Sequence, residues 1–154
     1  EVEMEKNMPK YFTYRHAIDQ IAKAIESGFY LEAITIEESI LVDRLYRFCR
    51  DNGLTKNASE ATLGTVETYI KRLPSEIQQV EKIDFLDELY RFRVNRNKCL
   101  HQVAKSEPGE ATMPFEDFLS LARETALGGK ELTKKVGNWS KRYKRKISKN
   151  NELN

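Results

Sequence analysis

Apolar side chains recur along most of the chain with the three-to-four-residue spacing of amphipathic helices. The pattern predicts five helical segments separated by glycine- or proline-containing turns. No alternating pattern of useful length predicts a β-strand. The sequence therefore predicts an all-α fold, a compact helical bundle of four to five helices with short connections. The predicted segments are approximately residues 11–27, 29–50, 59–73, 75–105 and 114–139, the fourth beginning between 75 and 82.

The two ends of the chain are set apart from this bundle. Residues 1–10 are expected to form a flexible N-terminal extension, residues 11–140 the bundle, and residues 141–154 a basic C-terminal tail. The fifth segment could continue past Trp139 into the tail, or glycines within it could interrupt it.

Charge is distributed unevenly along the chain. The 26 Lys and Arg and 24 Asp and Glu residues give a net charge of only +2. From residue 130 onward, however, nine basic residues stand against two acidic ones, a local charge of +7. Such a basic end favours contact with a polyanion, nucleic acid above all, although a solvated tail would have the same composition. The residues expected to bind RNA are Lys141, Arg142, Lys144, Arg145 and Lys146.

Several classes of protein do not fit this composition. Cys49 and Cys99 are too few for a disulfide framework, and with His16 and His101 they give no zinc-binding spacing. The mean hydropathy is −0.65, and no apolar run approaches the roughly 18 residues of a membrane span. The first residues are charged and do not resemble a secretory signal. We therefore expect a cytoplasmic protein with no metal, no other cofactor and no membrane contact.

The fourth segment carries polar residues inside its apolar face. Such groups cost free energy unless they are paired or line a cleft. Arg96 and His101 are about 140° apart on the helical wheel, so they cannot share one narrow face. A two-fold dimer in which this helix packs against its copy would bring both pairs together; polar groups satisfied within a core or interface are the alternative. The four residues are Arg93, Arg96, Asn97 and His101.

The run Arg96-Asn97-Lys98-Cys99-Leu100-His101 resembles the R-x(4–6)-H motif of the HEPN superfamily (higher eukaryotes and prokaryotes nucleotide-binding domain). In that motif a polar residue, often Asn, commonly follows the Arg. The resemblance covers the helical architecture over about residues 11–140, but the sequence only at the motif. HEPN domains are helical bundles that dimerise through the motif-bearing helices. Many are metal-independent ribonucleases, frequently toxins or abortive-infection effectors, and others are inactive binding modules.

The resemblance implies a role for three residues. His101 would transfer protons, Arg96 would stabilise the charge that develops on the phosphate, and Asn97 would orient the histidine or the RNA backbone. Glu38 falls inside the apolar stripe of the second segment, where it could pair with Arg93 or Arg96 and hold it in place. A salt bridge with no catalytic part is the alternative.

The sequence thus predicts a metal-independent endoribonuclease of the HEPN type that cleaves RNA by 2′-OH attack at a composite site. Its partner would be a second copy, bound through the helix that carries Arg96 and His101. A toxin or phage-defence role, with an antitoxin or defence-complex partner, follows from the resemblance alone. Val103 stands where HEPN toxins regulated by a nucleotidyltransferase have a Tyr, so adenylylation there is not expected. The alternatives are an inactive helical module that binds RNA or a protein partner, and a plain interaction protein with a basic tail.

Overall fold

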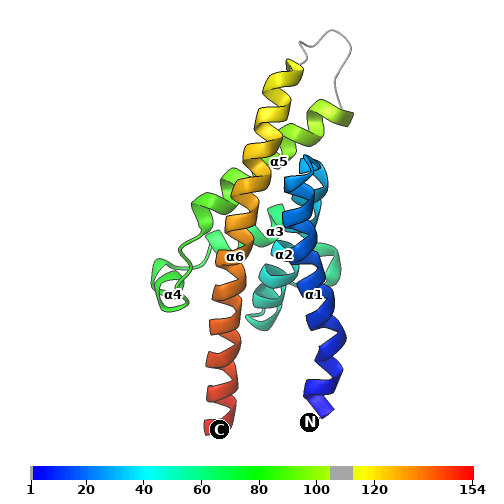
Figure 1. Ribbon diagram of the computed structural model, residues 1–154. Coiled ribbons are helices and arrows are strands. Elements are labelled where there is room, and N and C mark those ends of the chain that lie inside the picture. Colours follow the sequence, from blue (N-terminus) through cyan, green and yellow to red (C-terminus); the bar gives the residue numbers. More distant parts are fainter. Residues whose placement is uncertain (1, 105–112) are drawn as a thin grey trace.

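A computed structural model describes residues 2–104 and 113–154 of the chain, and the side chains of residues 8–103 and 113–154. All regular secondary structure in these residues is helical, which confirms the predicted all-α class (Figure 1). None of the helices described combines the length and the apolar character needed to cross a bilayer. The elements are α1 (Val2–Glu26), α2 (Tyr30–Asp51), the short 3-10 helix η1 (Ala58–Glu60), α3 (Leu63–Lys71), α4 (Ser75–Val80), α5 (Leu86–Ala104) and α6 (Phe115–Leu153).

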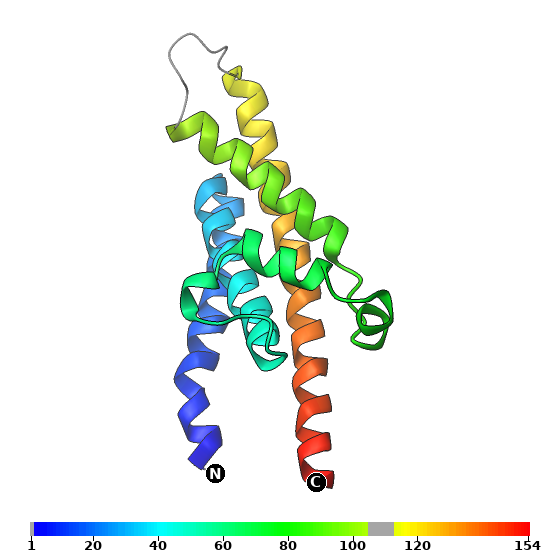
Figure 2. The same cartoon turned by 180° about the vertical axis from the view of Figure 1, so that it is seen from behind.

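The long helix α6 organises the bundle. It packs against α2 and α5 and also contacts α1, while α3 packs against α2 and α5. Figures 1 and 2 show that α1 begins and α6 ends at the same end of the molecule, where the labels of both chain termini lie. The end of α5 and the start of α6 lie at the opposite end. The molecule therefore has two distinct ends, and the predicted motif is far from the termini.

The described residues contain six α-helices rather than four or five, because the predicted fourth segment divides into α4 and α5. The helices α1, α2 and α4 all end in the same way, with a residue at positive φ: Gly28, Gly53 and Lys82 respectively. At each end, two amide groups bond back to carbonyls of the last turn, as in Ile83 N–H to the Gln78 carbonyl at 2.9 Å. Glycine marks the first two ends in the sequence. A lysine in this conformation does not mark a helix end in the sequence, so α4 and α5 were predicted as one segment.

Both ends of the predicted bundle belong to longer helices. Residues 2–10, expected as an extension, are the first turns of α1, and residues 141–154, expected as a tail, are the last turns of α6. Gly129 does not interrupt α6. A glycine is required there because α5 approaches closely: a Cβ would be 2.6 Å from Cε2 of Phe92. The predicted end of the fourth segment, at Lys105 followed by residues 106–109, lies outside the described residues.

Trp139 on α6 joins several elements at the centre of the core. Its ring is 2% exposed and meets the rings of Phe48 on α2 and Phe85 edge-on, with centroid distances of 5.1 Å. The ring also stacks on Tyr143, and its indole N–H donates to the carbonyl of Glu81 at 2.7 Å. This one side chain therefore ties α6 to α2 and to the turn between α4 and α5.

A carboxyl group lies in the same interior. Glu37 on α2 is 0% exposed, and its two carboxyl oxygens have no hydrogen-bond partner among the described residues. Burial raises its pKa to about 9, against a smaller opposing effect of Lys130. The neutral, protonated form of Glu37 is therefore the one that belongs to the folded protein at neutral pH.

This carboxyl group should make the stability of the fold depend on pH. The pKa of Glu37 is raised on folding, so unfolding releases its proton at every pH between the unfolded value near 4.5 and about 9. Over that interval its contribution should decrease by on the order of 1 kcal/mol per pH unit as the pH rises. Glu37→Gln should flatten this slope in chemical denaturation at a series of pH values. Glu32→Gln, which alters an exposed carboxyl on the same helix, is the control and should leave the slope unchanged.

Candidate functional site

The arginine of the predicted motif is held by a glutamate from a neighbouring helix. Nε and Nη2 of Arg96 on α5 each donate to one carboxyl oxygen of Glu38 on α2, both at 2.7 Å. This two-bond arrangement fixes the plane of the guanidinium. Of the two pairings that the sequence allowed for Glu38, the structure contains the one with Arg96. Both side chains are partly exposed, so the pair lies at the surface of the bundle and not in its core.

Asn97 adds a third contact to the same guanidinium. Nη1 of Arg96 donates to Oδ1 of Asn97 at 2.7 Å. A guanidinium has five N–H groups, and the described residues engage three of them. One N–H on each terminal nitrogen is left for an acceptor outside this set. The arrangement suits an anion with two exposed oxygens, such as the two non-bridging oxygens of a phosphate diester.

Arg96, Asn97 and His101 line a single surface cleft of about 770 Å³ near the end of α5, which we call the α5 cleft. His101 is exposed and lies one helical turn beyond Asn97. Across the cleft, the amide of Met113 donates to the side chain of Gln102 at 3.0 Å, which joins the segment before α6 to α5. Arg96 and His101 share no narrow helix face, yet this cleft is wide enough to include both. The other lining residues are Val94, Lys98, Leu100, Gln102 and Met113.

The second arginine of the cluster is engaged elsewhere. Arg93 donates through Nε to the carboxylate of Glu67 on α3, and its guanidinium carbon lies 5.5 Å from the ring centroid of Tyr90. Its hydrogen bond with Glu67 raises the pKa of the already basic guanidinium. Arg93 does not line the α5 cleft. Through its contact with Glu67, Arg93 connects α5 to α3.

The sequence analysis missed Glu67, although the signal that identified Glu38 was present there too. Leu63, Val66 and Ile70 form the buried stripe of α3, and Glu67 follows Leu63 by one helical turn, within that stripe. A carboxylate on an apolar face is expected to have a cationic partner. Applying the same test to both helices would have given two carboxylates for the two arginines.

The five basic residues predicted to bind RNA lie on different sides of α6. Lys141 and Lys144 face α1 and α2. Arg142 and Lys146 lie beside the turn after α4, where Nζ of Lys146 is 3.0 Å from the carboxylate of Glu81. Arg145 is exposed. Because successive residues are rotated by 100° in a helix, this basic segment cannot present one continuous surface.

The site is thus defined by side chains of α2 and α5. The described residues contain no group of three or more His, Cys, Asp or Glu placed to hold a metal ion. Comparisons with protein-family models, with curated proteins and with solved structures find no match for this chain. The geometry of Arg96, Asn97 and His101 around one cleft remains the basis for a functional proposal.

Proposed function

We propose that this chain is a metal-independent endoribonuclease of the HEPN type that cleaves RNA at a composite site made from two α5 clefts. The observation that carries the proposal is the placement of an oriented guanidinium and an imidazole around one open cleft. Glu38 and Asn97 hold Arg96, and His101 lines the same cleft. Translation arrest in the cytoplasm, as a toxin or defence effector opposed by an antitoxin, would be the corresponding role.

The chemistry requires no group beyond these side chains. The 2′-oxygen of RNA attacks the adjacent phosphorus, and the bond from phosphorus to the 5′-oxygen breaks. A neutral imidazole accepts the 2′-OH proton, and an imidazolium donates a proton to the departing 5′-oxygen. The two N–H groups of Arg96 that no described residue engages would stabilise the negative charge on the phosphate oxygens. The products are a 2′,3′-cyclic phosphate and a 5′-hydroxyl. Two copies of His101 supply the base and the acid.

Exposed apolar side chains beside the cleft support the second copy. Leu100 and Val103 on α5 and Phe115 and Leu119 on α6 are all exposed. Val103 and Phe115 line one hollow, which shares Gln102 and Met113 with the α5 cleft. Exposed apolar side chains gathered in this way are typical of an interface. Pairing through the end of α5 would cover it and would bring the two copies of His101 near one another.

A charge placed on this surface should separate the dimer. Val103→Glu introduces a carboxylate into the apolar interface, so the variant is expected to be monomeric in light scattering at concentrations where the unaltered chain is dimeric. Val80→Glu on α4 is the matched control, since the two valines are 59% and 64% exposed respectively. This control should remain dimeric. An unaltered chain that is monomeric at all concentrations tested would contradict the composite site.

One observation favours a second function, an inactive module that binds RNA or a protein partner. Glu38 neutralises the charge of Arg96, as it would in an ion pair whose purpose is to hold α2 and α5 together. Such a module would bind RNA in a salt-dependent manner without cleaving it.

Incubation of the purified protein with end-labelled tRNA and mRNA in the presence of EDTA separates the two functions. The ribonuclease is expected to produce fragments with 2′,3′-cyclic phosphate ends, identified by mass spectrometry. A DNA strand of the same sequence should stay intact, because it has no 2′-OH. RNA that stays intact across substrates and salt concentrations, but is retained in a binding assay, would establish the inactive module instead.

A further inference from the structure

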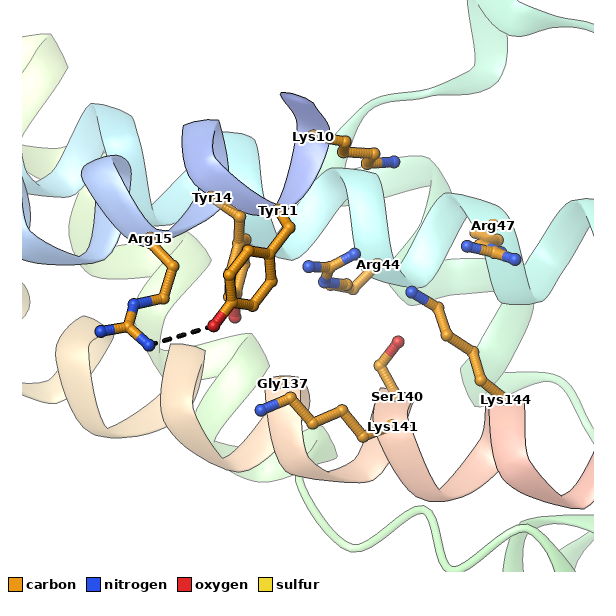
Figure 3. A pocket seen from close by; sticks show the side chains of 10 residues that line it. All are labelled: Lys10, Tyr11, Tyr14, Arg15, Arg44, Arg47, Gly137, Ser140, Lys141 and Lys144. Carbon is orange, nitrogen blue, oxygen red and sulfur yellow. Dashed lines mark hydrogen bonds between the residues drawn. The ribbon is translucent and has the colours of Figure 1, made fainter. Parts of the chain in front are cut away.

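A second cleft lies between α1, α2 and α6, towards the end of the molecule that holds the termini. It has a volume of about 400 Å³, and we call it the basic pocket (Figure 3). Ten residues line it, and six of them are Lys or Arg, although the chain as a whole is nearly neutral. The cationic residues are Lys10, Arg15, Arg44, Arg47, Lys141 and Lys144.

Few negative charges balance these cations among the described residues. Asp43 is the carboxylate that pairs with them, at 3.3 Å from Lys10 and 3.4 Å from Arg44. Nε of Arg47 is buried and has no hydrogen-bond partner among the residues described. A buried donor without an acceptor costs free energy, and so do like charges held together. The pocket is thus arranged in the way expected of a site that an anion completes.

Lys144 reflects the same surroundings, because its pKa is lowered to about 8. The main cause is burial, and the neighbouring charges of Arg44, Arg47 and Lys10 add to it. In Figure 3 the ammonium of Lys144 points towards α2, between Arg44 and Arg47. The negative charge of a bound anion would oppose these effects and favour the charged lysine.

The other end of the pocket is formed by two tyrosines. The hydroxyls of Tyr11 and Tyr14 point towards α6 near Gly137 (Figure 3). A Cβ at position 137 would lie 2.9 Å from the hydroxyl of Tyr14, so glycine allows this close approach. The guanidinium of Arg44 covers the ring of Tyr14 at 4.3 Å from its centroid. Cations, hydroxyl donors and an aromatic wall therefore surround one space.

We propose that the basic pocket binds a compact anion that carries two or more linked phosphate groups, either inorganic oligophosphate or the oligophosphate chain of a nucleotide. Six cationic side chains line a volume suited to a small molecule. A linked oligophosphate concentrates several negative charges in such a space, whereas an RNA backbone carries one charge per nucleotide along an extended path. Arginine forks and lysine ammonium groups are both established phosphate ligands. This proposal is independent of the ribonuclease, since the pocket shares no lining residue with the α5 cleft.

Calorimetric titration with sodium triphosphate tests the proposal. Arg47→Gln and Lys144→Gln should each weaken binding by about tenfold or more, because each removes a charged donor from the pocket. Arg145→Gln removes the same charge from the same region of α6 but lies outside the pocket, and it should retain nearly full affinity. The first two variants relieve repulsion between like charges. They should therefore fold with unchanged helicity by circular dichroism and unfold at the same or a higher temperature.

Proton uptake on binding distinguishes a specific role of Lys144 from a general effect of removing one positive charge. At a pH near 8.5, binding should draw a proton onto Lys144, which is detected by comparing buffers of different ionisation enthalpy. Lys144→Gln should abolish this uptake, and Arg145→Gln should preserve it. The charged groups that act on Lys144 in this titration are Lys10 on α1 and Asp43, Arg44 and Arg47 on α2.

Further arms of the titration identify the source of the phosphates. Equal affinity for triphosphate and ATP would support recognition of the phosphate groups alone, and tighter binding of ATP would support an added contact between base and tyrosine. Absence of triphosphate binding would overturn the proposal, as would an equal loss in Arg145→Gln. Tighter binding of a single-stranded RNA oligonucleotide, with the same loss in the pocket variants, would also overturn it and assign the pocket to RNA.

Discussion

Replacing His101 with alanine is expected to lower the rate of RNA cleavage by a factor of at least about 100. His101 supplies the imidazole of the α5 cleft, a group that both accepts and donates protons in general acid–base catalysis. Arg96 and Asn97 carry no comparable group, so their charge and hydrogen bonds would remain without proton transfer. The loss should appear in the rate at saturating RNA, measured by single-turnover cleavage with EDTA present.

His16→Ala is the control for this experiment, because the chain has two histidines and His16 is exposed on α1. It should cleave RNA at the rate of the unaltered chain. Both variants should have the molar mass of the unaltered chain by light scattering and keep its helicity. Equal cleavage by His101→Ala and the unaltered chain would rule out the proposed mechanism, and a trace nuclease contaminant would be the remaining source of activity.

Replacing Trp139 with alanine should lower the free energy of unfolding by about 3–5 kcal/mol, the largest effect on stability expected from one substitution here. The substitution removes ring contacts with Phe48, Phe85 and Tyr143 at once. It also leaves the carbonyl of Glu81 without the indole donor. The free energy of unfolding of natural domains is about 5–15 kcal/mol, so this substitution should remove a large part of the stability of the fold. Urea denaturation followed by circular dichroism measures the change.

Trp139→Phe separates the ring contacts from the hydrogen bond. Phenylalanine keeps an aromatic ring against Phe48 and Phe85 but cannot donate to Glu81, so its effect should be clearly smaller than that of alanine. If alanine cost less than about 1 kcal/mol, α6 would not depend on this side chain for its docking, contrary to the packing described above.

Helical periodicity was sufficient to predict the fold class, since every described element is a helix. Periodicity could not locate the turn at Lys82, because a lysine with φ of 54° looks like any helical lysine in the sequence. Nor could it show that α6 continues through its glycines. Gly129 lies where α6 approaches Phe92, and that contact exists only once the helices are packed.

The candidate site was predictable where one helix carries the information. Polar residues on the apolar faces of α2 and α5 identified Glu38, Arg96 and His101, but the choice of Arg96 over Arg93 as the partner of Glu38 depends on how the helices meet. The basic pocket could not be predicted from the sequence for the same reason. Arg44 and Arg47 are ordinary surface residues of one helix until α1 and α6 bring further cations to them.

The common location of the two termini has a practical consequence for any chain fused to this one. The N- and C-termini lie at the end of the molecule opposite to the end of α5 (Figures 1 and 2). Attachment to a solid support or a carrier protein through either terminus would therefore orient the α5 cleft outwards, accessible to a large substrate. The same attachment would stand close to the basic pocket, which lies between the helices that carry the termini. A carrier attached there would hinder access to the basic pocket more than access to the α5 cleft.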